Sequence, residues 1–502
     1  MGAPRGMVGV LAAVALALGW PVAAGAQAPL TVSGGKIVDQ QGRNVTLRGV
    51  NVNGLGDYWQ ARPEIPATLP LTADDFRQIS ALGLNSVRLL VHWSRLEPRR
   101  GDFDGAYLAQ IRQAVRWARG AGLVVVLDMH QDAWGKGVAT KPGEQCPLLL
   151  SPSVGWDGAP DWTTITDNQP NCRLVVRELS PSVMRAWQSF WDNRNGIRTE
   201  FARTWAWLAG AFAGDPTVVG YDILNEPNWG EDYERNLYGG RAAMYREVLA
   251  AIRAAERPET KKLVFFEPFA LWSAWPSEVT YRWAEDPNVV YAPHIYAGSI
   301  TLDKALFGQE IIPLEVGFQN ARTEAAYLGR TPVWVGEWGW FGGQTDYWKR
   351  FAAYEDAYQF GSAVWQWKQA CGDPHGFSSP TAAPPSGTTG NIMRIVCGDP
   401  DRPAGVPAGL DPQSAAMLSR PYPRAFPGSA VYRADVDARA LTMSGTAAAT
   451  DGPVELWVPG AQRPVITVTG ATVQSQTRRP GGWLVTVQPS GGKYAVTAAA
   501  RG

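Results

Sequence analysis

The sequence has no excess of charge of either sign. Its 502 residues include 46 lysines and arginines and 46 aspartates and glutamates, so the formal net charge is zero. A protein without net charge has no bulk attraction for nucleic acid or for an anionic membrane, although a local patch can still act. The sequence therefore predicts no nucleic-acid partner.

Cysteine is scarce, with only Cys146, Cys172, Cys371 and Cys397 in the whole chain. No close Cys-x-x-Cys or Cys/His spacing accompanies them, so no metal site is predicted. Four cysteines allow three pairings, and proximity along the chain favours Cys146–Cys172 and Cys371–Cys397. Each bridge closes a loop of about 25 residues, which is worth roughly 3 kcal/mol in the chain-entropy description.

Long apolar runs are also missing, except at the N-terminus. Arg5 precedes the almost wholly apolar stretch from Met7 to Trp20, and Pro21 and small residues such as Ala24-Gly25-Ala26 follow it. This pattern is typical of a secretory signal peptide over residues 1–28, and it is short for a membrane span. We expect a secreted protein, extracellular or periplasmic; an uncleaved anchor is the alternative interpretation.

No Gly-x-Gly-x-x-Gly follows the first expected strand, and no metal, nucleotide or flavin motif is present, so no cofactor is predicted. Eight apolar runs instead alternate with helix-compatible segments. The expected strands are Thr46–Val52, Asn85–Val91, Leu123–Asp128, Val218–Leu224, Leu263–Glu267, Val289–Pro293, Pro332–Gly336 and Ser362–Trp367. Alternating strands and helices predict a parallel sheet, and eight such units predict an α/β protein with a closed (β/α)8 TIM barrel over residues 29–420.

Two further β regions flank this barrel. Residues 35–48 have the pattern of a hairpin around a Gln41-Gly42 turn, which we expect to cap the barrel floor. Residues 421–502 lose almost all tryptophan and contain short β-rich runs between Gly/Pro turns, which predicts a C-terminal antiparallel β-sandwich domain. This region lacks a cluster of aromatics for binding sugars, so a structural role is predicted for it.

Two insertions exceed the ordinary length of βα loops. Residues 134–195 follow the third expected strand and contain Trp156, Trp162, Trp187 and Trp191, while residues 370–409 follow the eighth. Both should rise from the mouth of the barrel. An aromatic-rich rim there predicts a substrate channel, whereas the alternative is a rigid surface lid.

Two glutamates end buried strands. Glu226 lies in Tyr221-Asp222-Ile223-Leu224-Asn225-Glu226-Pro227, and Glu337 lies in Val333-Trp334-Val335-Gly336-Glu337-Trp338. Carboxylates at these positions lie at the C-terminal mouth of a β/α barrel, where such enzymes keep their chemistry. Two carboxylates facing each other across that mouth suit glycoside hydrolysis, in which one protonates the leaving oxygen and the other attacks the sugar carbon.

Residues at further strand ends make the chain resemble glycoside hydrolase family five, a clan A family of retaining β-glycosidases. The resemblance covers roughly residues 35–370. It implies Glu226 as general acid/base and Glu337 as nucleophile. The implied substrate-binding or supporting residues are Arg88, Asp128, His130, Asn225, Glu267, His294, Tyr296 and Trp365. Asp128 and Glu267 are equally compatible with a structural role, and Gln131, Asp132 and Trp134 are weaker candidates.

The chemistry sets expectations for each residue. Glu226 should have a raised pKa, so that it is protonated before attack. Glu337 should have a low pKa, held down by the charge of Arg88 and a hydrogen bond from Tyr296. Asn225 is placed to meet the sugar 2-hydroxyl, and retention predicts carboxyl groups about 5–5.5 Å apart.

Four further side chains of this set have predicted roles. His130, Asp128 and His294 should hydrogen-bond sugar hydroxyls or orient the acid/base. Trp365 should stack beneath the sugar ring.

Within the family, two phrases are similar to those of endoglycoceramidases, which release a whole oligosaccharide from ceramide. They are Asp128-Met129-His130-Gln131-Asp132 and the junction Ser419-Arg420-Pro421-Tyr422-Pro423-Arg424-Ala425. The resemblance implies a polar sugar pocket beside an apolar groove, to which Phe265, Phe266, Phe269 and Trp272 could contribute, although core packing explains the strand residues equally well. No lysine near Asn51–Trp59 matches the one that such enzymes use to read the sugar, so sugar preference stays open.

The leading prediction is therefore a retaining endo-β-glycosidase that cleaves the bond between saccharide and ceramide. Its partner is a glycolipid or oligosaccharide, with transient contact with a lipid surface, and the chain is expected to be a monomer. A secreted endo-β-glucanase, or a β-diglycosidase or β-glucosidase acting on other aglycones, is the alternative. A non-catalytic binding protein on an inactive barrel is disfavoured because both glutamates are present.

Overall fold

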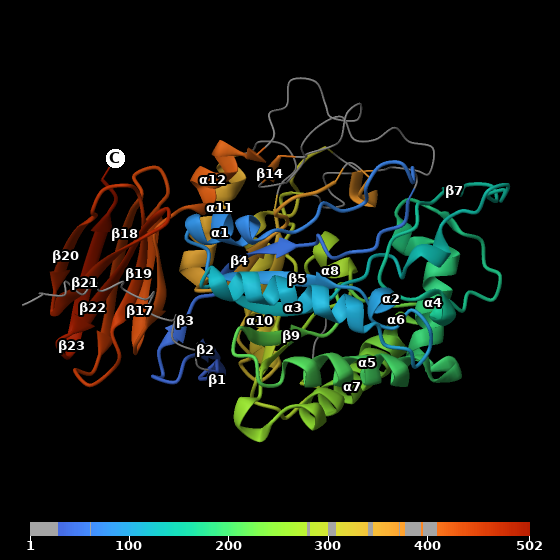
Figure 1. Cartoon of the computed structure of the whole chain (residues 1–502), viewed down its shortest axis with the longest axis horizontal. Helices are drawn as coiled ribbons and strands as arrows, with labels where there is room; N and C mark the ends of the chain where they lie inside the picture. Colours follow the sequence, from blue (N-terminus) through green and yellow to red (C-terminus); the bar gives the residue numbers. More distant parts are fainter. Residues whose placement is uncertain are drawn as a thin grey trace, which may run out of the picture.

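A closed barrel of eight parallel strands forms the centre of the molecule (Figure 1). The computed structural model describes residues 29–60, 62–278, 282–299, 308–339, 345–370, 372–376, 393–394 and 409–501. The barrel strands are β4 (Arg48–Val52), β5 (Ser86–Val91), β6 (Val124–Met129), β9 (Val218–Asp222), β10 (Leu263–Phe266), β11 (Val289–Tyr291), β12 (Trp334–Trp338) and β13 (Gly361–Val364). They pair in the order β11-β10-β9-β6-β5-β4-β13-β12, and a parallel bridge from Tyr291 to Val333 closes the ring. The predicted TIM barrel is confirmed, with all eight strands within a few residues of their expected positions.

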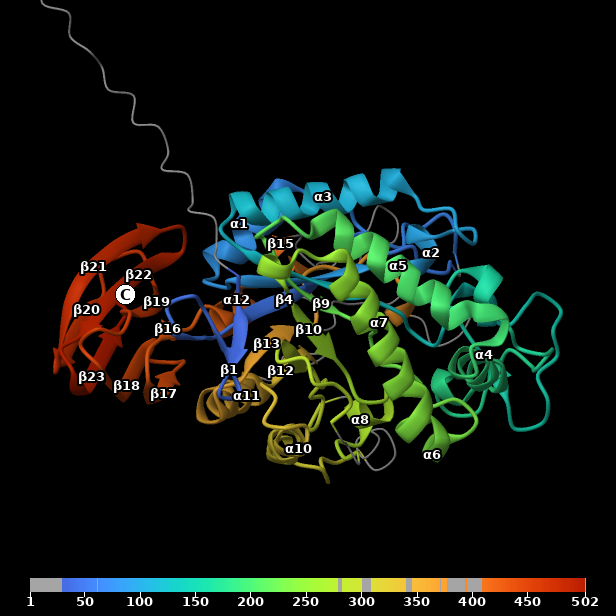
Figure 2. The same ribbon diagram turned by 90° about the horizontal axis from the view of Figure 1, so that it is seen from below.

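Helices surround the strands on the outside. The longer ones are α1 (Ala73–Ala81), α3 (Gly105–Gly120), α4 (Pro181–Trp191), α5 (Ile197–Phe212), α7 (Arg241–Ala255), α10 (Leu314–Tyr327) and α11 (Thr345–Tyr358). The shorter ones are α2 (Trp93–Leu96), α6 (Tyr233–Arg235), α8 (Leu271–Ala274) and α12 (Pro412–Leu418). Local sequence explains where several begin: Thr72 and Asp75 form a reciprocal cap for α1, and Asp104 caps α3 through the N–H groups of Ala106 and Tyr107. Figure 2 shows α5 and α7 packed against each other on the outer surface.

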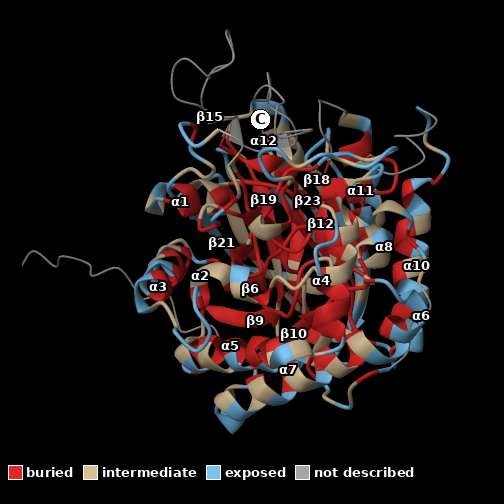
Figure 3. Ribbon diagram, turned by 90° about the vertical axis from the view of Figure 1, so that its right-hand side faces the viewer, coloured by how far each residue is buried: buried red, intermediate tan, exposed pale blue. Residues whose placement is uncertain are grey.

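Alternate residues of each strand enter two different cores. In β6, Val125 and Leu127 pack outward against the helices, while Val124 and Val126 pack in the barrel interior. Because successive side chains of a strand point to opposite faces, an uninterrupted apolar run is what a strand buried on both faces requires. Figure 3 shows the resulting concentration of buried residues at the centre and of exposed residues on the outer helix faces.

The N-terminal hairpin takes part in two structures. Its strands are β1 (Thr31–Ser33), β2 (Lys36–Val38) and β3 (Asn44–Val45). Leu30 and Ile37 pack with the interior residues at the floor of the barrel, as the sequence predicts. In addition, β3 pairs antiparallel with β16 (Tyr422–Phe426), so the hairpin belongs to the same sheet as the C-terminal region.

The C-terminal region is a sandwich of two antiparallel sheets. The seven-stranded sheet has the order β1-β2-β3-β16-β19-β22-β21, and the four-stranded sheet has the order β17-β18-β23-β20. The strands not yet given are β17 (Ser429–Asp435), β18 (Ala440–Ala447), β19 (Val454–Pro459), β20 (Val465–Thr469), β21 (Ala471–Arg479), β22 (Gly482–Pro489) and β23 (Gly492–Ala499). Side chains from both sheets, such as Leu441 on β18, Leu456 on β19 and Val485 on β22, form one shared core. The predicted sandwich is therefore present.

The first insertion rises from the mouth of the barrel. Its short strands β7 (Ser151–Pro152) and β8 (Cys172–Arg173) pair as an antiparallel hairpin, and Figures 1 and 2 place it at the opposite end of the molecule from the sandwich. Cys146 and Cys172 form the predicted disulfide. The second insertion is described only in part, through β14 (Met393–Arg394) paired with β15 (Gly409–Leu410).

Two predictions fall on parts of the chain that are not described. The predicted signal peptide, residues 1–28, and the predicted disulfide Cys371–Cys397 both lie outside the described residues. Among the helices that are described, none combines the length and the apolar character that crossing a bilayer requires.

Candidate active site

Glu226 and Glu337 meet at the C-terminal mouth of the barrel. Glu226 follows β9 and Glu337 is part of β12. One carboxylate oxygen of each, together with a ring nitrogen of His294, lie within 4.8 Å of one another. This separation is that of a retaining glycosidase, since inverting enzymes hold the two groups about 6.5–9.5 Å apart to admit a water molecule.

Arg88 lies at the centre of the site and is fully buried. Its Nε donates a hydrogen bond to Asp222 at 2.9 Å, and its two terminal nitrogens donate to four further acceptors. These acceptors are Asn51 at 3.0 Å, Glu337 at 2.8 Å, Asn225 at 3.0 Å and Glu267 at 2.8 Å. A guanidinium has five N–H donors, so all five are used. Asp128 lies 3.0 Å from the same group.

Glu337 is held on both carboxylate oxygens. Arg88 donates to Oε1, and the Tyr296 hydroxyl donates to Oε2 at 2.9 Å, as the sequence predicts. The expected low pKa is not found: burial raises the pKa of Glu337 above its ordinary value, and the positive charges of His294 and Arg88 only partly offset this. The prediction was wrong because it counted the neighbouring cations and left out the cost of removing the carboxylate from water.

Glu226 is held by two donors on one oxygen. His294 Nδ1 lies 2.8 Å from Oε1, and the Ser273 hydroxyl donates to the same atom at 2.5 Å. Burial alone would raise the pKa of Glu226, but the hydrogen bonds from His294 and Ser273 and the charge on His294 lower it below its ordinary value. The expected raised pKa is therefore absent in the free protein, in which the adjacent His294 has the strongly raised pKa.

His294 connects three carboxylates of the site. Its Nε2 lies 3.2 Å from Glu267, and its Nδ1 lies 2.8 Å from Glu226 and 3.5 Å from Glu337. Glu267 in turn accepts a hydrogen bond from the Glu226 backbone N–H at 2.8 Å, and burial raises the pKa of Glu267 to about 7. His294 and Glu267 thus both contact Glu226, the arrangement expected if His294 orients an acid/base at that position.

His130 has both ring nitrogens occupied by the protein. Nδ1 lies 2.8 Å from Asp128, and Nε2 lies 3.3 Å from Asp132. Burial opposes its protonation, but these two aspartates, Asp128 first, raise the pKa of His130 to about 10. The imidazolium stacks on Trp365 with ring centroids 5.4 Å apart. His130 therefore supports Trp365 rather than presenting a ring nitrogen to a sugar.

A second histidine, His375, packs on the same tryptophan and has no place among the residues predicted from the sequence. Its ring lies 5.2 Å from that of Trp365, its Nδ1 lies 2.5 Å from Asp373, and its Nε2 lies 3.4 Å from Asp132. Burial opposes protonation, but Asp373 and Asp132 raise the pKa of His375 to about 9. Trp365 thus contacts two histidines that share one aspartate, Asp132.

Asn225 and Gln131 fix the backbone that carries the acid/base. Asn225 accepts from Arg88 and donates to the Gln131 carbonyl at 2.9 Å. The Gln131 side chain donates to the carbonyl oxygens of Asn225 and Glu226, at 2.7 and 2.9 Å. Glu226 has a backbone φ of 37°, a left-handed conformation that costs energy outside glycine. These bonds hold Glu226 in that conformation.

The aromatic channel predicted for the first insertion is not what the structure contains. Trp134, Trp156, Trp187 and Trp191 are buried in the main core, and Trp162 is partly buried against it. Tryptophans in that position stabilise a packed lid, because Trp187 contacts Trp134, Phe190 and Trp191, while Trp156 packs on His375 and Trp162 on Trp93.

Nor do the residues suggested for a groove line one. The side chains of Phe265, Phe266, Phe269 and Trp272 are all buried. Exposed apolar side chains lie instead on either side of Ser273, at Leu271 and at Trp275, which is 54% exposed.

Sequence reasoning missed several residues that the site uses. Asp222 precedes Glu226 at the end of β9 and could have been found from that position. Ser273 follows β10 in a short helix and gave no signal. Two groups of side chains offer ligand atoms within metal-binding distance of one another, Glu226 with His294 and Glu337, and Asp128 with Asp222 and Glu267. Arg88 forms ion pairs with all three members of the second group, so its positive charge takes the place that a metal ion would have there.

Comparisons with known proteins agree with this geometry. The sequence model for "Cellulase (glycosyl hydrolase family 5)" matches residues 38–371. Endoglycoceramidase I of Rhodococcus hoagii (strain 103S) is 29% identical over 286 residues, which is 53% of this chain and 52% of that protein. The chain thus spans about half the length of this curated relative.

Two solved structures are similar over nearly their whole length. The crystal structure of an endogalactoceramidase superposes with a TM-score of 0.83 at 40% identity, covering 94% of this chain and 99% of that one. Endo-glycoceramidase II from Rhodococcus sp., solved as a complex with ganglioside GM3, superposes with a TM-score of 0.69 at 25% identity, covering 93% and 99%.

Proposed function

This chain belongs to the cellulase family, glycosyl hydrolase family 5, and from that premise we propose that it releases the sugar head group of a glycosphingolipid from its ceramide with retention of configuration. The proposed reaction rests on one observation: the carboxylates of Glu226 and Glu337 lie close together, and each accepts hydrogen bonds from its own set of donors. The similarity to two ceramide-releasing enzymes supports the substrate class.

In the first step, Glu337 attacks the anomeric carbon while the bond from that carbon to the ceramide oxygen breaks. Arg88 and Tyr296 each hold one oxygen of Glu337, which fixes the direction of attack. Glu226 gives the ceramide oxygen its proton. Burial opposes protonation of His294, but Glu267, Glu337 and the hydrogen bond with Glu226 raise its pKa, which favours a proton on its ring; the hydrogen bond of 2.8 Å to Glu226 Oε1 can deliver that proton to the carboxylate.

In the second step, Glu226 removes a proton from a water molecule, which attacks the anomeric carbon and frees Glu337. The hydrogen bonds that lower the pKa of Glu226 favour its ionised form at this stage. The same side chain thus serves as acid and then as base, while His294 stays bonded to it.

The ceramide is expected on the side of the acid/base, because Glu226 protonates the oxygen that leaves. Ser273 contacts Glu226 directly, and its neighbours Leu271 and Trp275 are exposed apolar side chains. Tyr233, the first residue of α6 in the segment after Glu226, is exposed to a similar extent. We propose that these three side chains meet the start of the lipid.

The sugar next to ceramide is proposed to be galactose. The 40% identity to an endogalactoceramidase exceeds the 25% identity to endo-glycoceramidase II. No lysine lies near Asn51–Trp59 to read the sugar, which supports a sugar preference different from that of endo-glycoceramidase II. A matched pair of galactosylceramide-based and glucosylceramide-based lipids tests this preference directly.

The decisive assay compares these glycosphingolipids in detergent with a soluble β-glucan, using Glu337→Gln as the inactive control. Intact saccharide and free ceramide, absent with the variant, are expected. Cleavage of the glucan without release of ceramide would replace the proposal with an endo-β-glucanase on the same barrel. Failure on both, with hydrolysis of an aryl β-glycoside, would leave a β-glycosidase with a different aglycone.

We also propose that the protein is exported. The residue pattern at the N-terminus supports this, and so does the Cys146–Cys172 disulfide, since such bonds persist in oxidising compartments. Recovery of a chain that begins near residue 29 from the medium or the periplasm tests it.

A further inference from the structure

The segments that lead into β7 and out of β8 expose aliphatic side chains to an unusual degree. Leu148 and Leu149, shortly before β7, are 92% and 79% exposed, and Leu174 and Val175, directly after β8, are about half exposed. We call these four residues the leucine tip. Single exposed aliphatic residues are common on proteins, but four of them beside one short pair of strands indicate a contact surface.

Leu149 has a second unusual property. Its backbone φ is 74°, in the left-handed region. Glycine or asparagine adopts this conformation at lower cost, and a large apolar residue there is an outlier. Neither burial nor backbone preference explains a leucine at this position, which indicates that its side chain serves an external partner.

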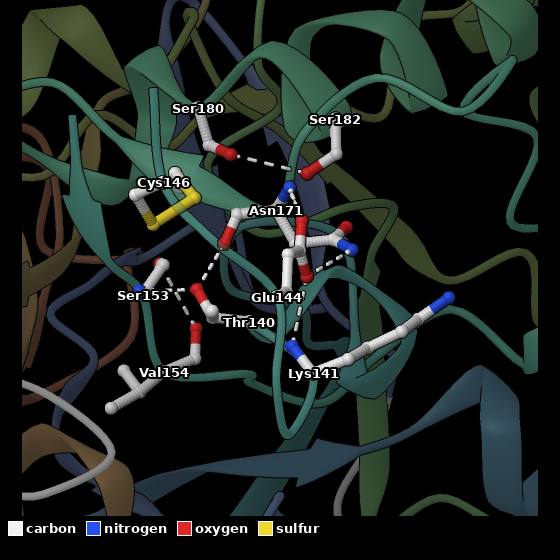
Figure 4. Close-up of a disulfide and its surroundings, with 10 residues drawn as sticks. Thr140, Lys141, Glu144, Cys146, Ser153, Val154, Asn171, Ser180 and Ser182 are labelled. Atoms are coloured by element: carbon white, nitrogen blue, oxygen red, sulfur yellow. Dashed lines mark hydrogen bonds between the residues drawn. A yellow bond between two sulfur atoms is a disulfide. The ribbon is translucent and has the colours of Figure 1, made fainter. Parts of the chain in front are cut away.

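The hairpin is built to hold the leucine tip in place. The disulfide joins Cys146, in the segment before β7, to Cys172, the first residue of β8 (Figure 4). Glu144 accepts hydrogen bonds from the backbone N–H groups of Lys141 and Asn171, and the Thr140 hydroxyl donates to the Asn171 carbonyl. A rigid support lowers the entropic cost of inserting a loop into a partner.

The chain directly after Val175 is tied to the active site. Arg177 donates to Asp132 at 2.7 Å, the aspartate that bonds both histidines around Trp365. Asn228, two residues after Glu226, donates to the Glu178 carbonyl at 2.9 Å. The leucine tip therefore lies on the same side of the mouth as the loop that carries the acid/base.

From these observations we propose that the leucine tip inserts into the lipid surface that holds the substrate. The proposal rests on the proposed function, because ceramide remains among lipid tails while its head group enters the mouth. Charge agrees with a phospholipid surface. The segment from Gln145 to Pro152 has no charged side chain; Lys141 and Arg173 near it are positive, and Glu144 directly before it is negative but accepts hydrogen bonds from two backbone N–H groups. Apolar side chains flanked by cations are typical of segments that lie in the bilayer interface.

The test uses purified chain and phosphatidylcholine vesicles, with and without galactosylceramide, in a flotation assay. The test variant is Leu148→Asn/Leu149→Asn, in which asparagine suits the left-handed backbone, so the hairpin should fold at least as well. The matched control is Val431→Thr/Val465→Thr, which alters two exposed valines on the sandwich. We expect roughly a tenfold loss of vesicle binding for each leucine replaced, and no loss in the control.

Activity is measured on the same proteins with a soluble aryl β-glycoside and with galactosylceramide in vesicles. The tip variant should lose vesicle turnover and keep turnover of the soluble substrate. If the tip variant binds vesicles as well as the unaltered chain does, the proposal is wrong. It is also wrong if the unaltered chain sediments as a dimer and the variant as a monomer, because a second copy would then cover the tip. Failure of the unaltered chain to release ceramide even in detergent would refute the proposed function instead, while vesicle binding would still report on the tip.

Discussion

Replacing Arg88 with lysine should disable the site while leaving its charge intact. Arginine at this position uses five N–H donors on Asn51, Asp222, Asn225, Glu267 and Glu337. Lysine has three donors on one nitrogen, so at least two acceptors lose their partner. Because all of them are buried, water cannot replace the lost bonds without opening the core.

The magnitude follows from the bonds that are lost. A hydrogen bond to a charged group contributes roughly 1.5–3 kcal/mol, so losing two should lower the free energy of unfolding by about 3–6 kcal/mol. A second effect concerns Glu337, whose pKa burial already raises. Weaker support from residue 88 should raise that pKa further, so the acid limb of the activity profile should move to higher pH.

Urea unfolding, followed by tryptophan fluorescence, measures the first effect, and kcat/KM for an aryl β-glycoside against pH measures the second. Arg420→Lys is the matched control. Arg420 is equally buried and pairs with Glu355 and Asp356 at 2.6 and 2.7 Å, away from the mouth. The control should lose stability and keep its pH profile. An Arg88→Lys protein within about 1 kcal/mol of the unaltered chain in stability, with an unmoved acid limb, would refute the reasoning.

Three further predictions concern single contacts. Ser273→Ala removes a hydrogen bond that lowers the pKa of Glu226, so the basic limb of kcat/KM should move up by about half to one pH unit, and an unmoved limb would contradict this role. His130 and His375 have folded pKa values of about 10 and about 9, above the unfolded value, so their stabilisation is complete below about pH 6.5 and is lost as the pH rises through 9 to 10. Asp132→Asn should therefore lower the melting temperature far more at about pH 6 than at about pH 10, and an equal loss at both would show that charge is not the cause. Cys146→Ser should cost roughly 3 kcal/mol of hairpin stability, seen as faster proteolysis within residues 140–176, with aryl β-glycoside hydrolysis as the control for a folded barrel.

The positions of the catalytic residues could be predicted because strand ends are visible in a sequence. Val218–Asp222 and Trp334–Trp338 are apolar runs, and whatever follows or ends such a run lies at the mouth. Asp222 also ends an apolar strand, but the Asn225-Glu226 motif that follows it is a stronger sequence signal, so Asp222 was overlooked. Ser273 could not be found in this way, since a four-residue helix has no periodic pattern to place it.

The protonation states and the exposure of aromatic side chains depend on distances that the sequence does not contain. Whether Glu337 has a high or a low pKa depends on the balance between burial and the charges of Arg88 and His294. Whether a tryptophan lines a channel or fills a core depends on what packs against it. In the first insertion the neighbours of Trp187 are Trp134, Phe190 and Trp191, which cover one another.

The pairing of β3 with β16 makes the chain's two ends depend on each other. The hairpin at residues 31–45 lies before the barrel in the chain, yet the strand that extends its sheet, Tyr422–Phe426, lies after the barrel. Arg420, just before that strand, also completes an ion cluster with Glu355 and Asp356 beneath the barrel. The sandwich therefore helps to hold the barrel together. A chain that ended after residue 419 would leave β3 without its partner strand β16, and Glu355 would keep Arg48 but lose Arg420.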